Sequence, residues 1–545
     1  MPPQRSEGVP RVVIEQPVVI VGGGPVGLTL ALELAWHGIA STVLEPRERV
    51  DDTRPRAKTT NVRSMEHYRR LGLAGIIRER APLRAAWNQR AVFCTSLSGS
   101  EITSFDDVFA IRAERSDLFA ECGQQLAQPL LEEILREQVQ SNPLTTLILG
   151  ATAQTVSERA DSVVVTYSDS DGAEQTIESS FVVGADGAGG VTRQSAGIGM
   201  ERGIDLPLNV NITFTAPDLT ATSSLGEALH YWIVNATTLG VLIRLDETDT
   251  WAATITRVTD PENADPLELL ERLTGFPVDA TVLSTDFWAA RLAVADDYGT
   301  HRVFLVGDAA HLNPPWGGHG FNTGLGDAVN LGWKLAATLQ GWAGPELLAS
   351  YEPERRPVAE QTIAVAAKNM AAIPPSVFEA LMDDPELTGP EAATVSRAVH
   401  EAKDSEFHSL GLVLGYSYTE SPIVVGGTPL NGRFDSVDYV PSFAAGSRLP
   451  HFWLPDGRSI YDLLDPGFTL FADADTGLAA DFVEAAAERD IPFTIVSGVT
   501  DETLLVRSDG HIAWRGTSIS QPSAAGILDA ARGASSSIAT ERASS

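Results

Sequence analysis

The chain has 545 residues, enough for two or three domains at about 150 residues each. Its hydrophobic content of 43% and charged content of 20% are typical of a soluble globular protein. The formal net charge of −33 argues against nucleic acid or an anionic membrane as the main partner, although a local site can still bind a small anion.

The two cysteines, Cys94 and Cys122, are too few for a disulfide framework or a multi-cysteine metal site. The first 16 residues lack the apolar segment of a signal peptide. The longest apolar runs have the length of strands, so no membrane span is expected. A cytoplasmic protein without a metal is therefore predicted.

The first predicted unit is a strand, a helix and a second strand at residues 18–21, 25–37 and 41–44. A G-x-G-x-x-G pattern joins the first strand to the helix. Its glycines allow a tight turn, a close approach to a pyrophosphate and close helix packing, and Glu45 stands where an acid can bind a ribose hydroxyl. The pattern predicts NAD or the ADP half of FAD, with these residues at the nucleotide: Gly22, Gly24, Gly27 and Glu45.

The middle of the chain reads as mixed α and β structure. A helix is predicted at 126–140, strands at 160–185, and three β-rich runs of an antiparallel sheet within 208–257. Helices are predicted again at 322–340 and over the segment from 351 to 372.

A second motif follows a strand and contains Asp186 and Gly187. It is not another G-x-G-x-x-G, so no separate Rossmann unit for NAD(P)H is expected. A third motif lies at 303–338, where Asp308 follows a strand and can accept hydrogen bonds from ribityl hydroxyls. Two prolines stiffen its loop, and its glycines leave backbone uncovered for a flat ring. The helix after it can face the electron-rich end of a flavin. The residues assigned to the cofactor in this motif are Gly307, Asp308, Pro315, Gly318, Gly320, Phe321 and Asn322.

Together the three motifs resemble the class A, single-component flavoprotein monooxygenases. The third motif carries the family pattern over a long stretch, from Gly307-Asp308-Ala309-Ala310-His311 to Trp333-Lys334-Leu335. Residues 54–73 and the C-terminal unit are similar to the phenol, dichlorophenol and polyketide hydroxylase branch. The resemblance also implies FAD contacts at these residues: Pro25, Val26, Arg63, Gln128, Asp186 and Gly187.

The resemblance implies an α/β fold with a Rossmann-like FAD-binding domain of the para-hydroxybenzoate hydroxylase type. An antiparallel β-sheet substrate domain and a thioredoxin-like C-terminal domain would complete it. That last domain has no C-x-x-C, so it is expected to serve packing or contact within a homodimer. The expected boundaries are 15–200 and 285–410 for the FAD-binding domain, with 85–120 contributing to the pocket, 201–284 for the substrate domain, 411–446 for a linker, 447–533 for the thioredoxin-like domain and 534–545 for a tail.

The implied activity is hydroxylation of a phenolic or polyketide-like ring with FAD, NAD(P)H and O2 through a flavin C4a-hydroperoxide. Lys58 is the first catalytic candidate, either as a cation beside a phenolate or as a base. Arg291 and Tyr231 are the other two. The weaker substrate-pocket candidates are Trp288, Pro314, Trp316 and His319, whereas His311 is expected to be structural.

Two alternatives keep the same fold. One is a Baeyer–Villiger-type or ring-opening flavin oxygenase, and the other is a non-catalytic flavin-binding protein. Flavin halogenases are disfavoured because their W-x-W-x-I-P signature is absent. The sequence leaves open the substrate, the choice between NADH and NADPH, and the oligomeric state.

Overall fold

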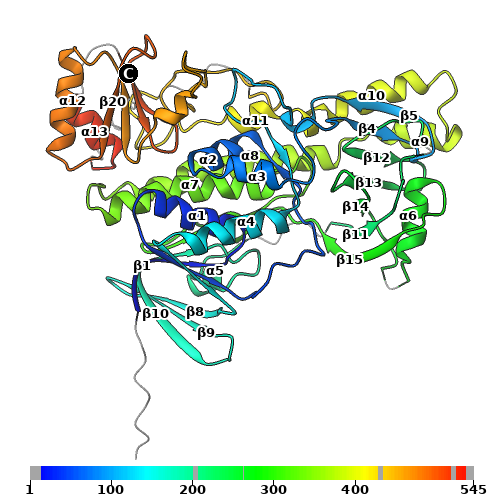
Figure 1. Ribbon diagram of the computed structural model, residues 1–545, viewed down its shortest axis with the longest axis horizontal. Helices are drawn as coiled ribbons and strands as arrows, with labels where there is room; N and C mark the ends of the chain where they lie inside the picture. The colour runs from blue at the N-terminus through cyan, green and yellow to red at the C-terminus, as the bar shows by residue number, and fades with distance from the viewer. Residues whose placement is uncertain are drawn as a thin grey trace, which may run out of the picture.

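The computed structural model describes residues 14–200, 206–221, 223–261, 263–427, 434–516 and 523–534. Figure 1 shows a central body of helices over one sheet, a second sheet beside it and a smaller unit at the C-terminal end. The tail predicted at 534–545 lies outside these residues except for its first position.

The central sheet is built around β1 (Ile14–Val21), which pairs in parallel with β2 (Ser41–Glu45) and β10 (Glu174–Gly184). Its strand order is β7-β2-β1-β10-β9-β8, and β17 also pairs with β10. The remaining bounds are Thr145–Leu149 for β7, Thr152–Glu158 for β8, Val163–Ser168 for β9 and Val303–Leu305 for β17. This sheet confirms the strand–helix–strand unit predicted from the first motif.

Helices α1 (Pro25–Trp36), α4 (Gln128–Ser141) and α7 (Gly320–Leu339) lie together along the central sheet (Figure 1). They close the main hydrophobic core with β1, β2 and β17. The predicted long helix is α8 (Tyr351–Met370). Short elements complete this body, namely α2 (Val62–Arg70), α3 (Ala74–Arg80), α5 (Val191–Ser195), β3 (Thr59–Thr60), β6 (Gln124–Gln125), β16 (Ala293–Val294) and β18 (His311–Leu312).

The second sheet has the strand order β15-β11-β14-β13-β12-β4-β5. Its bounds are Thr281–Ala289, Leu208–Thr215, Thr250–Ile255, Leu239–Arg244, His230–Val234, Ala91–Cys94 and Glu101–Phe105, in that order. The three predicted runs are β11, β12 and β14. The sequence did not predict β13. Strand β4 pairs in parallel with β12, and β5 pairs with β4, so residues between α3 and α4 complete this sheet. Helices α6 (Pro266–Thr274), α9 (Pro375–Asp383) and α10 (Ala392–Phe407) pack around it.

The C-terminal unit has the strand order β20-β19-β21-β22, with β19 and β20 parallel and the other pairs antiparallel. This order, with helices between the first two strands and after the last, is that of a thioredoxin-like fold. The bounds are Phe468–Phe471 for β19, Gly477–Ala487 for α12, Phe493–Val496 for β20, Leu504–Arg507 for β21, Ile512–Arg515 for β22 and Ala524–Ala531 for α13.

The described part of the segment predicted as a linker is packed against the protein. Helix α11 (Leu410–Leu414) buries Leu412 and Leu414, and Tyr418 and Ile423 are buried after it. Within the described residues, none of the helices combines the length and hydropathy needed to cross a bilayer.

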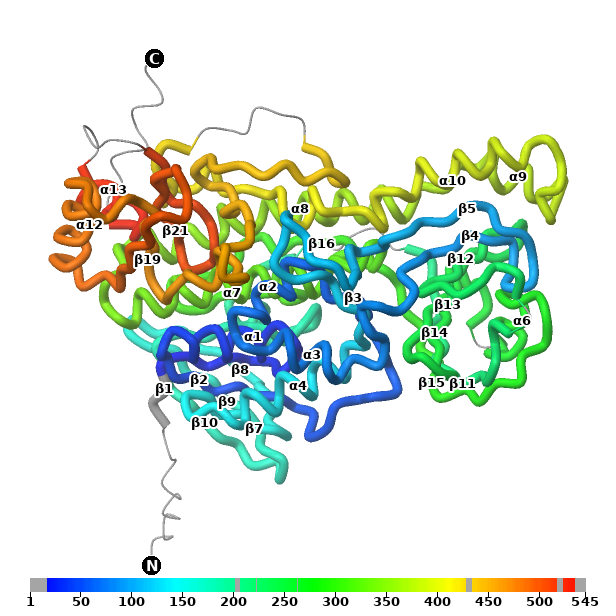
Figure 2. The backbone as a smooth tube through the Cα atoms, turned by 45° about the horizontal axis from the view of Figure 1, so that its top comes forward, coloured from blue at the N-terminus to red at the C-terminus, as the bar shows by residue number. Residues whose placement is uncertain are grey.

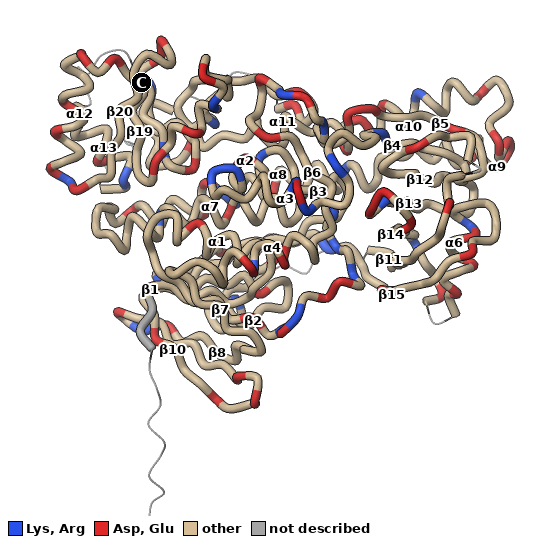
Figure 3. Tube along the Cα trace, in the orientation of Figure 1, with Lys and Arg blue, Asp and Glu red and all other residues tan. Residues whose placement is uncertain are grey.

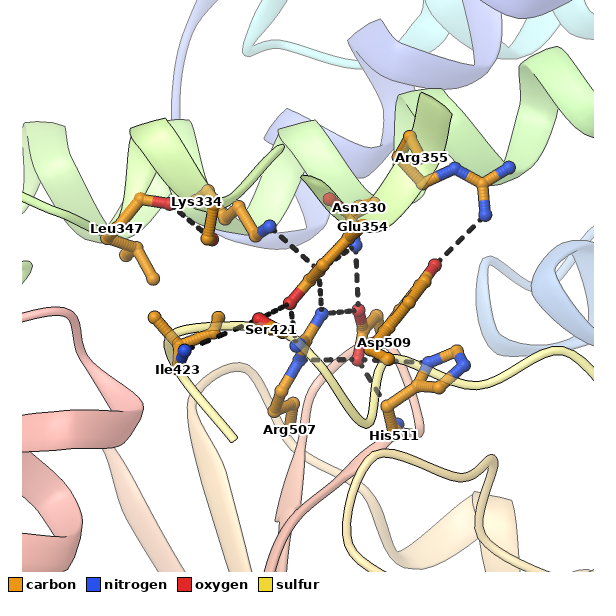
Figure 4. Close-up of polar contacts among 12 residues, drawn as sticks. Asn330, Lys334, Leu347, Glu354, Arg355, Ser421, Ile423, Arg507, Asp509 and His511 are labelled. Carbon is orange, nitrogen blue, oxygen red and sulfur yellow. Dashed lines mark hydrogen bonds and ion pairs between the residues drawn. The ribbon is translucent and has the colours of Figure 1, made fainter. Parts of the chain in front are cut away.

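A buried charge network joins the C-terminal unit to the central helices (Figure 4). The carboxylate of Glu354 on α8 accepts hydrogen bonds from Arg507 on β21 at 2.6 and 2.8 Å, and from Lys334 on α7 at 2.8 Å. Asn330 and Ser421 each donate to the same carboxylate at 2.6 Å. Asn330 and Lys334 of the long third motif therefore dock the C-terminal unit.

Candidate active site

A cavity of about 920 Å³ lies between the central body and the second sheet. Such a volume is near the upper end of the about 300–1,000 Å³ that is usual for ligand pockets. Figure 2 shows β3 and the chain after α3 passing between these two parts. The central body contributes Gln128, Ala188, Asp308 and the loop 312–321, while residues 54–59 form a further wall. A site shared by two structural units can bind a cofactor on one side and a second molecule on the other.

The glycine-rich turn before α1 is tightly packed against the sheet. Gly22 has a φ of +111°, and a Cβ atom there would lie 2.3 Å from the carbonyl oxygen of Ala185. A Cβ atom on Gly27 would lie 2.0 Å from the carbonyl oxygen of Gly22. Gly24, the N-cap of α1, has no side-chain cap and no atom within 4 Å of its would-be Cβ. The helix N-terminus beside Gly24 is thus accessible to an anion such as a pyrophosphate.

Glu45 ends β2 directly beside this turn and is buried. One carboxylate oxygen accepts from the backbone N–H of Gly23 at 2.8 Å, and the other accepts from Arg47. The carboxylate therefore holds the turn, and its predicted contact with a ribose stays a proposal.

We expect Gly24→Ala to fold normally and to bind FAD more weakly, because its methyl group would meet only the space assigned to the pyrophosphate. Gly27→Ala should instead lose folded protein, since its methyl group has no room. Thermal unfolding and a flavin titration of both variants separate these effects. Equal flavin affinity in Gly24→Ala and the parent would contradict binding of the nucleotide at this turn.

Asp308 follows β17 and lines the cavity. Its side chain is exposed to the cavity but enclosed by the protein, and this enclosure raises its pKa above the ordinary value. Among the described residues, none donates a hydrogen bond to its carboxylate. The Asp308 carboxylate can therefore accept hydrogen bonds from the ribityl hydroxyls of a bound flavin.

The loop after Asp308 is held in place by Asn322 near the start of α7. The Asn322 amide donates to the carbonyl oxygens of Thr59 and Gly318 at 2.9 and 2.7 Å, and accepts from Ser64 at 2.7 Å. The loop backbone at Gly318 has a φ of +68°, which favours glycine. The predicted cofactor residues that line the cavity here are Pro315, Gly318, Gly320 and Phe321, whereas Gly307 packs against Val26 and Asn322 faces inward.

The four other predicted cofactor residues differ in their surroundings. Gln128 begins α4 and lines the cavity. Asp186 accepts from the N–H and hydroxyl of Thr192 at 2.9 Å, so it fixes the start of α5, and Gly187 turns the chain with a φ of +78°. Arg63 lies outside the cavity, because its guanidinium donates to the carbonyl oxygen of Asp509 at 2.7 Å.

Lys58 and Arg291 both line the cavity, whereas Tyr231 does not. Burial lowers the pKa of the Lys58 ammonium to about 8, and its Nζ donates to the carbonyl oxygen of Arg56 at 2.8 Å. Arg291 is exposed at the cavity. The Tyr231 hydroxyl donates to the carbonyl oxygen of Gly226 at 2.6 Å within the core of the second sheet.

Only some of the predicted substrate-pocket residues line the cavity. Trp288 and Trp316 line the cavity, but Pro314 is buried away from it. His319 is 3% exposed and turns inward, and burial lowers its pKa to about 4. His311 is structural, as predicted, with its Nε2 at 2.7 Å from the Asp327 carboxylate.

Several residues that line the cavity were not predicted. His230 and Trp232 on β12 face it, since alternate residues of a strand point to opposite faces and Tyr231 faces the core. The alternation of side chains along β12 could have identified His230 and Trp232 from the sequence. Asn211, Thr254, Phe109 and Glu406 also line the cavity, and they come from distant parts of the chain.

The site fits FAD on two observations of the chain itself. The open N-terminus of α1 can bind the pyrophosphate, and the carboxylate of Asp308 accepts no hydrogen bond within the described chain. Figure 3 shows Asp and Glu over all parts of the molecule, with Lys and Arg near β3 and β6. Arg54 and Arg56 line the cavity in this region, so the local charge opposes the global one.

Comparison with known proteins identifies the family of the chain. Residues 15–366 match the FAD binding domain family, and residues 442–534 match the aromatic-ring hydroxylase C-terminal domain. The FAD-dependent monooxygenase apdD of Emericella nidulans is 32% identical, over 95% of this chain and 90% of its own. A putative polyketide hydroxylase of Streptomyces halstedii is 30% identical, over 94% and 95%.

Solved structures agree over nearly the whole length. RebC with bound 7-carboxy-K252c is 34% identical and superimposes with a TM-score of 0.86, over 96% of this chain and 100% of that one. A ternary complex of aklavinone-11 hydroxylase with FAD and aklavinone is 27% identical, with a TM-score of 0.80 over 95% and 99%. The chain belongs to the FAD-dependent aromatic-ring hydroxylases, a family of flavoprotein monooxygenases.

Proposed function

We propose that this protein hydroxylates a phenolic or polyketide-like aromatic substrate, with FAD, NAD(P)H and O2. The observation that carries the proposal is the shared cavity, which extends from the Asp308 loop to the inner face of the second sheet. Relatives named as polyketide hydroxylase and 2,4-dichlorophenol 6-monooxygenase support the substrate class. A screen of phenols and polyketide aromatics for stimulated NAD(P)H oxidation, with mass spectrometry of products, tests it.

The bound FAD supplies the oxygen transfer, and the chain's residues position and protect the reactants. The N-terminus of α1 would hold the pyrophosphate, Asp308 the ribityl chain, and the backbone of loop 317–321 the ring. Trp232 and Trp288 offer flat apolar walls to an aromatic substrate on the sheet side. FAD and substrate bound between the two parts would displace water from the cavity.

Lys58 is the residue that acts on the substrate hydroxyl in this proposal. Its pKa of about 8 leaves it mostly charged at neutral pH. An ammonium in a cavity of low dielectric stabilises a phenolate, which is the more nucleophilic form of the ring. We therefore assign Lys58 as a cationic partner rather than as a base.

Lys58→Met should slow hydroxylation by about 100-fold, as for other lost electrostatic contacts, while FAD stays bound. In the parent, kcat/KM should fall as the pH rises through about 8, because Lys58 then loses its charge. The fall should be absent in Lys58→Met. Parent-like turnover in that variant, or a rate that rises through this pH, would contradict the assignment.

A homodimer and a cytoplasmic location remain proposals from the sequence. The C-terminal unit is the expected contact between two copies. Light scattering of the purified protein, compared with a variant that carries charge substitutions on the outer face of α12, tests the dimer.

A further inference from the structure

Beside β12 the cavity is lined by three titratable side chains, Lys58, His230 and Glu406, and we call this part of it the polar end. They come from the segment before β3, from β12 and from α10. The Phe109 ring lies 5.5 Å from His230 on β12 and 5.6 Å from Phe407 on α10, and the Lys58 charge acts on His230, so the three segments approach one another there. Of the three polar side chains, only Lys58 has a role in the proposed function.

Glu406 is the anionic member of the polar end and is 1% exposed. Its Oε2 accepts a hydrogen bond from Lys403 Nζ at 2.8 Å. Lys403 also donates to the carbonyl oxygen of Asn369 at 2.7 Å and lies 5.5 Å from the Trp232 ring, so its position is fixed. Burial raises the pKa of Glu406, and the Lys403 charge opposes that rise. The ion pair holds the carboxylate in one orientation.

The second carboxylate oxygen of Glu406, Oε1, can accept a hydrogen bond from a ligand. Among the described residues, none donates a hydrogen bond to Oε1, and this atom is not sealed from the cavity that its side chain lines. The nearby His230 is neutral, because burial and the Lys58 charge lower its pKa to about 3. Glu406 is thus the anionic acceptor at this end.

The buried Lys403–Glu406 ion pair adds little to the stability of the fold. A buried ion pair is often no more stabilising than apolar residues of the same size, because both charges must leave water. A carboxylate oxygen that only the cavity can supply with a donor adds a further cost until that donor is present. A ligand with an O–H or N–H group would offset this second cost.

We propose that Glu406 is a specificity-determining residue, whose Oε1 accepts a hydrogen bond from an O–H or N–H group of the aromatic substrate. Lys403 is its positioning residue. The inference rests on the proposed function and adds the requirement that the substrate carries a donor at the polar end. An O-methylated analogue would leave the carboxylate unpaired and would be rejected.

The test is equilibrium binding to the oxidised, FAD-loaded protein, followed by the change in flavin absorption. The probes are matched pairs, 2,6-dihydroxynaphthalene with its monomethyl ether and 2,6-dihydroxyanthraquinone with its monomethyl ether, so that every probe keeps one hydroxyl for Lys58. The parent should bind at least one phenol about 10- to 100-fold more tightly than its ether, as expected for a hydrogen bond to a charged group. Glu406→Gln should reduce this ratio to near one, and Glu401→Gln, an exposed position on the same helix, should keep it.

The outcomes separate the two proposals. Equal binding of phenol and ether by the parent, or an unchanged ratio in Glu406→Gln, overturns the role of Glu406 and leaves the hydroxylase intact. Failure of every phenol to bind or to stimulate NAD(P)H oxidation counts against the proposed function, and the inference falls with it. If Glu406→Gln does not fold, the double variant Lys403→Met/Glu406→Leu removes both charges and should show the same lost ratio.

Discussion

Replacing Glu354 with alanine is expected to destabilise the protein by about 3–5 kcal/mol, the usual cost of removing one partner from a buried ion pair. The change would leave Arg507 and Lys334 buried without their shared carboxylate. It would also break the contact between β21 and helices α7 and α8. Since α7 begins at the cofactor loop, flavin should be lost more readily on heating.

Thermal unfolding of the FAD-loaded protein measures this effect. The control is Glu360→Ala, an exposed position on the same helix, which should change stability by less than about 0.5 kcal/mol. If both variants unfold at the same temperature, the network does not hold the C-terminal unit.

The pH dependence of this stabilisation has a definite sign. Burial by itself raises the pKa of Glu354, but the Arg507 and Lys334 charges outweigh it and hold the pKa well below the ordinary value of 4.5. The contribution is therefore complete above about pH 4.5 and declines as the pH falls toward the folded-state pKa. Glu354→Ala should lose less stability relative to the parent in strong acid than at neutral pH.

Replacing Asp308 with alanine is expected to weaken FAD binding by about 10- to 100-fold, since hydrogen bonds to a charged acceptor contribute about 1.5–3 kcal/mol. No atom of the described chain donates to this carboxylate, so its loss should leave the fold intact. Flavin content after purification and a flavin titration of the apoprotein report the change. Asp297→Asn, an exposed position ahead of β17, is the control. Undiminished flavin content in Asp308→Ala would remove Asp308 from the cofactor site.

The sequence predicted the parts of the site that are local in the chain. The turn around Gly24 and the loop after Asp308 each follow a strand and precede a helix, and the fold confirms both contexts. The residue choice on β12 failed because the strand's two faces were not assigned. Had they been, alternation would have selected His230 and Trp232 instead of Tyr231.

Contacts between distant segments could not be predicted from one sequence. Glu406 reaches the cavity from a helix that follows the second sheet by about a hundred residues. The family resemblance placed Arg63 at the cofactor, but the carbonyl oxygen of Asp509 in the C-terminal unit accepts a hydrogen bond from its guanidinium. Both depend on domain packing, which local patterns do not encode.

The central claim is that FAD in this cavity transfers one atom of O2 to a phenolic ring. The most direct measurement is turnover of an accepted aromatic substrate under isotopically labelled O2, with NAD(P)H oxidation and product mass followed together. We predict a yellow protein whose NAD(P)H oxidation rises with substrate and whose product is a new phenol with one labelled oxygen. A lactone or a ring-opened product would contradict this claim. So would NAD(P)H oxidation that no aromatic compound stimulates.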